Sequence, residues 1–444
     1  MRWPHAGAPA AVVRAATPAR LPLRRVLVDL TPLEPGGENG GARLVALSLV
    51  QEIGRLAPHI QQVVLTNARA HAELAWLDAS NVSRQCVLGA QADPAGRRHW
   101  LRTWVRAGLD LALPSAARVR LKDAFWRAVK GRQRTRTTNA LRPDLVFCPF
   151  TAPHYWTADI PLVSVIYDLQ YLAYPQFFGP DQRRYRHQHV VDACRQSARV
   201  VCISETVRAS LLANVQVPAE RVTTIHLAPL QPLVEVPVPD GNRLLDGLGL
   251  RAERFLLFPA NFWAHKNHAA LIEAVRLFRA RQPGSDLRVV CTGTPNPLMH
   301  DLASSAERAA PGVFVFPGFL AAAELVTLLK RCKALVFPSL FEGFGMPVLE
   351  AMSVGKPVLC SNSTSLPEVA GDAAYLFDPS NTDAIANAIE WLESRPAEVA
   401  ALAARGPRRA AAFGTARDMA AAYLEVFEAA VGVGSGQPGQ VRLR

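Results

Sequence analysis

Two glutamates, Glu342 and Glu350, enclose the sequence Gly-Phe-Gly-Met-Pro-Val-Leu. A carboxylate can accept hydrogen bonds from two neighbouring hydroxyl groups, such as those of a sugar or a ribose. Gly343 and Gly345 would let the backbone approach such a ligand closely. The spacing is explained equally well by a capped helix that carries two exposed acids, because Glu near a helix start is common for dipole reasons alone.

A helix is predicted to begin at Pro347, because proline is favoured at the first helical position. Gly355 would end this helix. The first backbone N–H groups of a helix have no partner within it, and the helix dipole favours an anion at that end. The stretch therefore predicts a phosphate site at the N–H groups near Val348 and Leu349.

A cation for a diphosphate is present at Lys266, between a predicted strand at 255–259 and a predicted helix at 267–281. In a parallel sheet this is the same edge as Glu342, and lysine is a point charge for phosphate. Lysine is also an ordinary residue at a helix start. His265 and His268 have no partners at metal-ligand spacing, and no D-x-D motif is present, so we predict a site without metal.

The elements that must position these residues repeat one pattern twice, a short apolar strand followed by a loop and a helix. The pattern predicts an α/β fold of two doubly wound, Rossmann-like domains that bind ligands between them, at the carboxyl ends of the strands. The predicted strands are 24–31, 62–66, 144–148, 161–167, 199–204, 255–259, 287–292, 313–316, 334–338, 357–360 and 373–377. The glycine-rich stretch 35–41 lacks G-x-G-x-x-G spacing and does not support a dinucleotide fingerprint.

Four prolines between residues 227 and 244 divide the two repeats of the pattern. A chain of 444 residues is also long enough for two hydrophobic cores. The predicted divisions are a disordered leader (1–23), an N-terminal acceptor-binding domain (24–232), a linker (233–250), a C-terminal nucleotide-sugar-binding domain (251–431) whose last helix could pack back on the first domain, and a disordered tail (432–444).

Most of the net charge of +12 comes from one segment, 97–142, which holds thirteen Lys and Arg, two Asp and several Trp. Basic residues with interleaved Trp suit the surface of an anionic membrane. A solvated helical surface and a nucleic-acid backbone are the alternatives. The segment is too polar to span a bilayer, and seven scattered cysteines without a C-x-x-C pair favour a reducing cytoplasm.

Several of these segments resemble the retaining family 4 glycosyltransferases, which have the GT-B fold, and within them a bacterial mannosyltransferase-like group. The resemblance covers most of the chain. The segments that carry it are 148–153, 168–172, 174–178, 202–206, 259–268, 292–293, 317–319, 342–350 and 365–371.

The resemblance implies that Glu342 holds hydroxyls of the donor sugar, Glu350 binds the ribose and Lys266 binds the diphosphate. It implies that the 318–319 loop lies against the base and that backbone of the 343–345 loop lines the sugar. The full set of donor-binding residues in this domain is Gly343, Phe344, Gly345, Val348, Leu349, Glu350, Gly318, Phe319, Asn261 and His265.

In the first domain, the resemblance implies that Gly40 and Gly41 close over the phosphate and the acceptor. It places Asp168 and Tyr167 among the catalytic residues, beside Glu342 and Lys266. Two positions depart from the family pattern. Tyr167 stands where the family usually has a histidine that faces the reacting sugar, and tyrosine cannot carry a proton at neutral pH as histidine does. Ala260 stands six residues before the lysine, where many members have an arginine.

The function implied is transfer of a hexose, with mannose from GDP-mannose favoured, to a glycan or lipid-linked acceptor in surface polysaccharide synthesis. The resemblance implies retention of configuration. With the cysteine pattern and the basic segment 97–142, we expect a cytoplasmic enzyme with a peripheral place at the membrane, no cofactor besides the nucleotide-sugar donor, and no nucleic-acid partner. Three alternatives are weighed against it: another nucleotide-sugar reaction on the same fold, such as that of an epimerase or a sugar-phosphate synthase; a catalytically silent assembly partner; and a nucleic-acid binder using 97–142.

Overall fold

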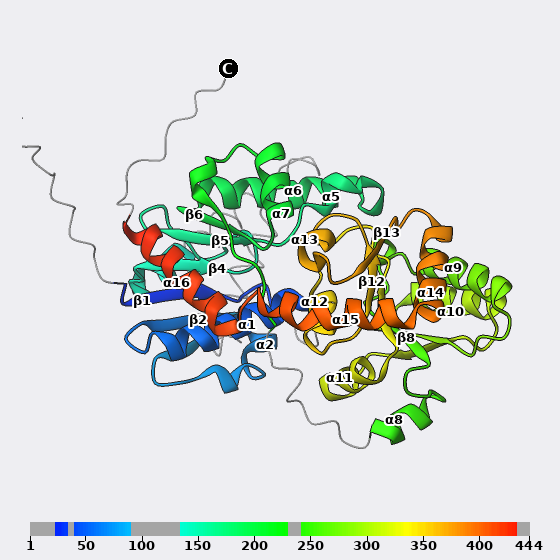
Figure 1. Ribbon diagram of the computed structural model, residues 1–444. Coiled ribbons are helices and arrows are strands. Elements are labelled where there is room, and N and C mark those ends of the chain that lie inside the picture. The colour runs from blue at the N-terminus through cyan, green and yellow to red at the C-terminus, as the bar shows by residue number, and fades with distance from the viewer. Residues whose placement is uncertain (1–22, 34–39, 90–133, 230–240, 433–444) are drawn as a thin grey trace, which may run out of the picture.

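The computed structural model describes residues 23–33, 40–89, 134–229 and 241–432. It contains two parallel sheets, each covered by helices on both faces, which lie side by side (Figure 1). This arrangement confirms the predicted fold class of two doubly wound α/β domains. The predicted leader and tail lie almost entirely outside the described residues.

The first sheet has the strand order β3-β2-β1-β4-β5-β6-β7, and all its pairs are parallel. Its strands are β1 (Arg25–Asp29), β2 (Gln61–Asn67), β3 (Val82–Leu88), β4 (Leu145–Cys148), β5 (Leu162–Ile166), β6 (Arg199–Cys202) and β7 (Val222–Thr224). Strands β4 and β5 are buried along their whole length, as expected for central strands covered on both faces. The order reverses between β1 and β4, which defines a switch point in this sheet.

The second sheet has the order β10-β9-β8-β11-β12-β13, again all parallel. Its strands are β8 (Phe255–Pro259), β9 (Arg288–Thr292), β10 (Phe314–Gly318), β11 (Ala334–Phe337), β12 (Val358–Ser361) and β13 (Tyr375–Phe377). Its order reverses between β8 and β11, so each domain has one switch point.

Helices connect the strands and cover the two sheets (Figure 1). In the first domain they are α1 (Gly40–Leu56), α2 (Ala68–His71), α5 (Gln170–Ala173), α6 (Pro180–Gln196) and α7 (Glu205–Asn214). The later helices are α8 (Gly241–Gly247), α9 (His268–Arg281), α10 (Pro297–Ala309), α11 (Ala322–Arg331), α12 (Met346–Ser353), α13 (Leu366–Ala370), α14 (Thr382–Ser394), α15 (Pro396–Ala411) and α16 (Ala416–Gly432). Helix α8 lies inside the predicted linker, where it begins only after the last of the prolines.

The last helix returns to the first domain (Figure 1). Helix α16 contacts α1, β4 and β5. Phe147 of β4 packs against Tyr423 and Phe427 of this helix, with ring centroids 5.6 and 5.0 Å apart. The chain therefore passes between the domains twice, and α16 adds its apolar face to the core of the first domain.

The predicted membrane-facing segment 97–142 is described only from residue 134 onward, so this prediction lies mostly outside the described residues. Within the described part of the chain, no helix combines the length and the apolar character needed to cross a bilayer.

Candidate active site

The switch point of the second sheet carries an ion pair. Lys266 follows β8 at the end of a 3-10 turn, η5 (Ala264–Lys266), and Glu342 follows β11. Lys266 Nζ donates to Glu342 Oε1 over 2.7 Å, and the two side chains are only 17% and 12% exposed. Ligands of open α/β sheets bind at this position. The structure therefore joins the two residues that the sequence analysis placed at the sugar and the diphosphate.

The loop that carries Lys266 is held by its neighbours. Asn267 has left-handed backbone angles, and its side-chain amide donates to the carbonyls of Pro338 and Pro379 over 3.1 and 2.8 Å. Leu340 N–H donates to the carbonyl of His265 over 2.8 Å. These bonds fasten the Lys266 loop to the chain just before Glu342, so the ion pair is preorganised.

Asn261 lies in the same loop, but its side-chain oxygen is already used. It accepts a hydrogen bond from Thr294 N–H over 2.9 Å. At Gly293 a Cβ would lie 2.7 Å from the carbonyl oxygen of Ala260, so only glycine fits there. The contacts of Asn261 explain how the two loops are packed, and its predicted role in donor binding stays a prediction.

The Gly-Phe-Gly loop touches the first domain. A Cβ on Gly343 would overlap the carbonyl oxygen of Tyr167, and the Ser204 hydroxyl donates to the Gly343 carbonyl over 2.7 Å. Gly345 has φ +108°, and a Cβ there would lie 2.5 Å from a methyl group of Leu366. Glycine is therefore required at both positions for steric reasons, and at Gly345 also for its backbone angles.

The start of α12 corrects one prediction. Val348 and Leu349 N–H were expected to be unpaired, but both donate to the carbonyl of Gly345, over 3.0 and 3.4 Å. The reason is that the helix begins at Met346, with Gly345 as its N-cap, one residue earlier than expected. Within the described residues, the N–H groups of Gly345 and Met346 have no hydrogen-bond partner. The backbone donors suited to a phosphate are therefore these two.

Glu350 lies in the second turn of α12 rather than in its first. Burial raises the pKa of its carboxyl group to about 7. Its carboxylate forms no hydrogen bond or ion pair with any residue that the structure describes. Since buried carboxylates are normally paired, this group fits the predicted role of accepting hydrogen bonds from ribose hydroxyls.

Asp168 brings the first domain to this site. It follows β5, and its Oδ1 accepts a hydrogen bond from Gln170 N–H over 2.9 Å. Burial raises the pKa of this carboxyl group; Arg186 and Lys266 act against that rise, and the Glu342 carboxylate adds to it. Asp168 thus lies within electrostatic reach of both members of the ion pair in the second domain.

Tyr167 is placed differently from what its predicted role requires. Its hydroxyl group is enclosed and has no hydrogen-bond partner among the described residues. Burial, with the Cys148 thiol nearby, raises its pKa, so the phenol stays protonated. Tyr167 meets the second domain through its backbone carbonyl, at Gly343. To face a sugar, the phenol would have to leave its enclosed position.

Arg186 is a residue that the sequence analysis missed. It lies on the exposed face of α6, with its guanidinium group 4.9 Å from the centre of the Phe178 ring. Its charge acts on both domains, since it opposes the rise in the pKa of Asp168 in one domain and contributes to the lowered pKa of His265 in the other. No ion pair of Arg186 occurs among the described residues. Arg186 therefore supplies a positive charge near the site, whereas Ala260 stands where many family members have an arginine.

Two histidines near the cation, the predicted residue His265 and its neighbour His268, cannot add positive charge. The pKa of His265 is lowered to about 4, by burial first and then by the Lys266 ammonium. The pKa of His268 is lowered to about 3 for the same reasons, and its ring packs against Phe258 and Phe262. Both imidazoles are therefore neutral at neutral pH.

The remaining predicted residues lie at loops of the two sheets without direct bonds to the ion pair. Gly318 ends β10 with φ +79°, and Phe319 after it is 67% exposed. Gly40 and Gly41 begin α1 and are exposed. Within the described residues, no hydrogen bond joins these four to Lys266 or Glu342. Their predicted contacts with the base, the phosphate and the acceptor stay predictions.

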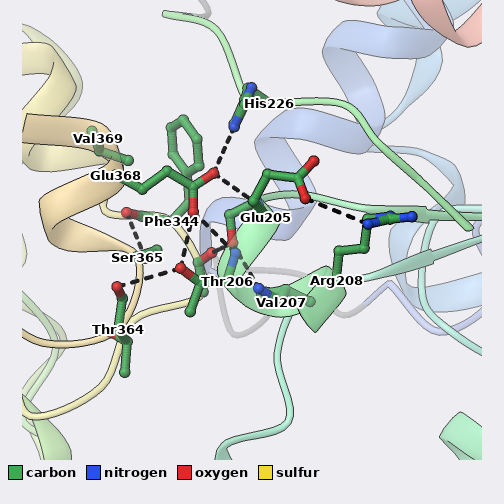
Figure 2. A network of polar contacts seen from close by, with 12 residues as sticks. Glu205, Thr206, Val207, Arg208, His226, Phe344, Thr364, Ser365, Glu368 and Val369 are labelled. Atoms are coloured by element: carbon green, nitrogen blue, oxygen red, sulfur yellow. Dashed lines mark hydrogen bonds and ion pairs between the residues drawn. The ribbon is translucent and has the colours of Figure 1, made fainter. Parts of the chain in front are cut away.

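A second polar contact joins the domains beside the Gly-Phe-Gly loop (Figure 2). Glu368 of α13 accepts hydrogen bonds from Glu205 N–H and His226 Nε2 through one oxygen, each over 2.7 Å. Its other oxygen accepts bonds from Thr206 N–H and the Thr206 hydroxyl, over 3.0 and 2.9 Å. One carboxylate of the second domain therefore caps helix α7 of the first.

Comparison with known proteins agrees with this architecture. The family model "Glycosyltransferase Family 4" matches residues 61–228, and the model "Glycosyl transferases group 1" matches 248–409. The structure of Anabaena Alr3699/HepE in complex with UDP and glucose superposes with a TM-score of 0.64 at 16% identity, covering 91% of this chain and 100% of that one. At this identity the likeness shows the fold alone, which is GT-B.

Two curated relatives from Escherichia coli are mannosyltransferases. O-antigen chain mannosyltransferase B is 30% identical over 229 residues, 50% of this chain and 58% of the relative. Serotype-specific mannosyltransferase WbdA is 26% identical over 369 residues, 77% of this chain and 42% of the relative. The matches thus span about half the length of each relative. With one family model on each domain, the chain belongs to the group 1, family 4 glycosyltransferases.

Proposed function

We propose that the protein is a retaining hexosyltransferase that takes its sugar from a nucleotide-sugar without a metal ion. The observation that carries the proposal is the Lys266–Glu342 ion pair at the switch point of the second sheet, with Asp168 of the first domain in electrostatic reach. Family membership supports the same reaction class. GDP-mannose is the donor favoured by the likeness to mannosyltransferases.

Each charge at this site has a use in sugar transfer. Glu342 would accept hydrogen bonds from hydroxyls of the sugar, and Lys266 would then turn to the diphosphate. The N–H groups of Gly345 and Met346 would add donors, and Arg186 a second cation. Developing negative charge on the leaving group would be stabilised by groups already in place, which is electrostatic catalysis without reorganisation.

In the proposed reaction, the bond between the anomeric carbon and the phosphate oxygen breaks. The acceptor oxygen forms its bond to the same face of that carbon. The proton of the acceptor hydroxyl passes to the leaving phosphate oxygen, so the products are the glycoside and the nucleoside diphosphate. Closure of the two domains would exclude water and so limit hydrolysis of the donor.

The acceptor is proposed to be a glycan or a lipid-linked glycan in surface polysaccharide synthesis. The names of the two mannosyltransferases support this proposal. The basic, Trp-bearing segment 97–142 would place a cytoplasmic enzyme at the inner face of an anionic membrane. Flotation with anionic liposomes checks this point, and equal binding after neutralising Arg97, Arg98, Arg102 and Arg106 would contradict it.

The experiment that tests the function compares Lys266→Ala and Glu342→Ala with the wild type. Binding of GDP-mannose and UDP-glucose is measured by calorimetry, and donor turnover is measured with and without acceptor. We expect each variant to lose at least about 100-fold in turnover while its melting temperature stays close to that of the wild type. Turnover without acceptor would indicate a different nucleotide-sugar reaction.

The matched control is Lys356→Ala. Lys356 is as buried as Lys266, with its side chain 14% exposed, and it forms an ion pair with Glu253 over 2.6 Å, away from the switch point. If Lys266→Ala loses no more activity than this control, the site is wrongly assigned. If the wild type binds neither nucleotide-sugar nor the corresponding diphosphates, the proposed function itself is refuted.

A further inference from the structure

The switch point of the first sheet carries a polar cluster of its own. Asp29 ends β1, and His154 lies in the loop after β4, the neighbouring strand across the switch point. These positions match those of Lys266 and Glu342 in the second sheet, each pair following the two strands at which the order reverses. The first domain therefore has polar side chains at the place where an open α/β sheet binds its ligand.

Asp29 is fully buried and accepts four hydrogen bonds. Its Oδ1 accepts bonds from the N–H and hydroxyl groups of Thr31, over 3.1 and 2.6 Å. Its Oδ2 accepts bonds from the N–H groups of His154 and Tyr155, over 2.7 and 3.2 Å. An ionised carboxylate can only accept hydrogen bonds, and each of these four groups is a hydrogen-bond donor.

This arrangement determines which nitrogen of His154 carries the proton. A threonine hydroxyl has one hydrogen, and that of Thr31 is given to Asp29. The contact of 3.0 Å between Thr31 Oγ1 and His154 Nδ1 must then have Nδ1–H as its donor. In the neutral ring this leaves a bare lone pair on Nε2, since a neutral imidazole carries one proton.

The neutral form is favoured by the surroundings. Burial lowers the pKa of His154, the Asp29 carboxylate acts against this, and Arg134 lowers the pKa further. No described residue donates a hydrogen bond to Nε2, and this atom is not among the enclosed polar atoms without a partner. Within the described residues, Nε2 is therefore an acceptor without a partner that is not fully enclosed, on a ring whose orientation is set by the Nδ1 bond.

The loop that carries His154 is held by contacts with its neighbours. Thr151 has φ +69°, a strained angle for a β-branched residue, and such strain persists only where the surrounding structure enforces it. The Tyr155 hydroxyl donates to the carbonyl of Val87 over 3.2 Å. Strand β4 pairs with β5, which leads to Asp168, and paired strands lie about 4.8 Å apart. His154 thus follows the strand next to the one that delivers Asp168.

We propose that His154 binds a hydroxyl group of the acceptor through Nε2, with Asp29 and Thr31 as the residues that position its ring. The inference rests on the proposed function, because it gives the first domain the acceptor of that reaction. A polyol such as a glycan offers hydroxyl donors that match a bare imidazole nitrogen. The nucleotide-sugar would bind at the second domain, where Lys266 and the Glu350 carboxylate lie.

The hydrogen-bond relay is tested first, without activity. Long-range ¹H–¹⁵N spectra of the histidine-labelled protein distinguish the two neutral tautomers, and His154→Gln identifies the signal of this residue. We expect the Nδ1–H form in the wild type, its loss in Thr31→Val and its return in Thr31→Ser. An Nε2–H form in the wild type would overturn the inference.

The role in acceptor binding is tested by kinetics with GDP-mannose or UDP-glucose, whichever the wild type turns over, and octyl α-mannoside as acceptor probe. His154→Gln and Thr31→Val should each raise the acceptor KM about tenfold, while the donor Kd stays within about twofold of the wild type. The control is His71→Gln, because His71 Nδ1 forms a similar bond of 2.7 Å with Thr66 in the same sheet.

The outcomes separate the two proposals. An acceptor KM in His154→Gln equal to that of His71→Gln, in an active enzyme, would overturn the inference and leave the function standing. A rise in the donor Kd of the same size as the rise in acceptor KM would place His154 at the donor and also overturn it. Failure of the wild type to bind any donor would refute the proposed function, and this inference with it.

Discussion

Replacing Glu368 by Gln should loosen the closed arrangement of the two domains. Its carboxylate is the shared acceptor for donors on Glu205, Thr206 and His226 of the other domain (Figure 2). A glutamine keeps the shape but has one accepting oxygen and one donating NH₂ group, which would face another donor. Every bond in the cluster would lose its charge, and at least one would become repulsive.

The size of the effect follows from the pKa. Burial alone would raise the pKa of Glu368, but the bonds to His226 and α7 lower it from 4.5 to about 2. A difference of this size corresponds to roughly 3 kcal/mol in favour of the charged form. The side chain is 21% exposed, and screening by solvent reduces the figure to about 2 kcal/mol. The equilibrium between closed and open domains should shift by about 30-fold.

The sign of the pH dependence follows from the lowered pKa. The contribution of Glu368 is fully present above its unfolded pKa near 4.5 and is lost as the pH falls towards 2. Titration of this carboxyl group therefore cannot open the domains between about pH 5 and pH 8. The substitution, rather than acid, is the means of testing this contact.

The assay combines small-angle X-ray scattering with steady-state kinetics. In saturating nucleotide, Glu368→Gln should have a larger radius of gyration than the wild type, and its kcat/KM should fall by about 10- to 30-fold. Glu398→Gln is the control, since the bonds that Glu398 forms among the described residues go to Trp391 and Arg395 of its own domain. A variant with the scattering profile and kcat/KM of this control would refute the reasoning.

Two further predictions concern the donor site. Gly343→Ala should displace the Gly-Phe-Gly loop from the first domain by roughly 1 Å, because its Cβ overlaps a backbone carbonyl, and a displacement of this size should lower kcat/KM about 100-fold. Gly284→Ala, which has open space for a Cβ, should be neutral, and equal kinetics of the two variants would contradict the prediction. Since the pKa of Glu350 is about 7 and the charged form accepts two hydroxyl bonds, donor affinity should rise as the pH increases from 6 to 8. Calorimetry across this pH range measures the donor affinity. If the affinity of Glu350→Gln depends on pH as steeply as that of the wild type, the titration belongs to another group.

The strands of the second domain, and its helices α9 and α12, were predictable because each carries a local signal. The strand predicted at 255–259 matches β8 residue for residue, and the helix predicted at 267–281 differs from α9 by one residue. Strands β3 and β7 were missed. Strand β3 alternates buried, half-buried and exposed positions with polar residues among them, and β7 has only three residues. Edge strands have weaker apolar patterns because one side has no neighbour.

The exact start of α12, at Met346, could not be predicted from local sequence rules. Pro347 predicted the helix correctly, but its position did not reveal that Gly345 would take a left-handed conformation and serve as the N-cap. That conformation depends on packing, since Gly345 has no room for a Cβ beside Leu366. A shift of one residue was enough to change which N–H groups are available to an anion.

Sequence patterns could not predict contacts between residues that are far apart in the chain. The bond between Thr31 and His154 joins residues 123 positions apart, and the Glu368 bonds to Glu205 and Thr206 span more than 160. His154 lies just after the segment 148–153 that carries the family resemblance, yet no local sequence pattern indicates that the orientation of its ring is fixed. Only pairing of β1 with β4 brings Asp29 and His154 together.

The two switch points differ in charge, and the difference fits a division of labour between donor and acceptor. The crevice of the second sheet has a lysine paired with a carboxylate, together with unpaired backbone N–H groups at Gly345 and Met346, which suits an anion joined to a polyol. In the crevice of the first sheet, the Asp29 carboxylate is used up by four donors, and a neutral imidazole is presented instead. Arg134 acts on His154 there, but the group presented is a neutral imidazole, which gives a hydroxyl an acceptor. The bonds of Glu368 to helix α7 join the two domains, so the acceptor hydroxyl and the anomeric carbon would approach from opposite domains.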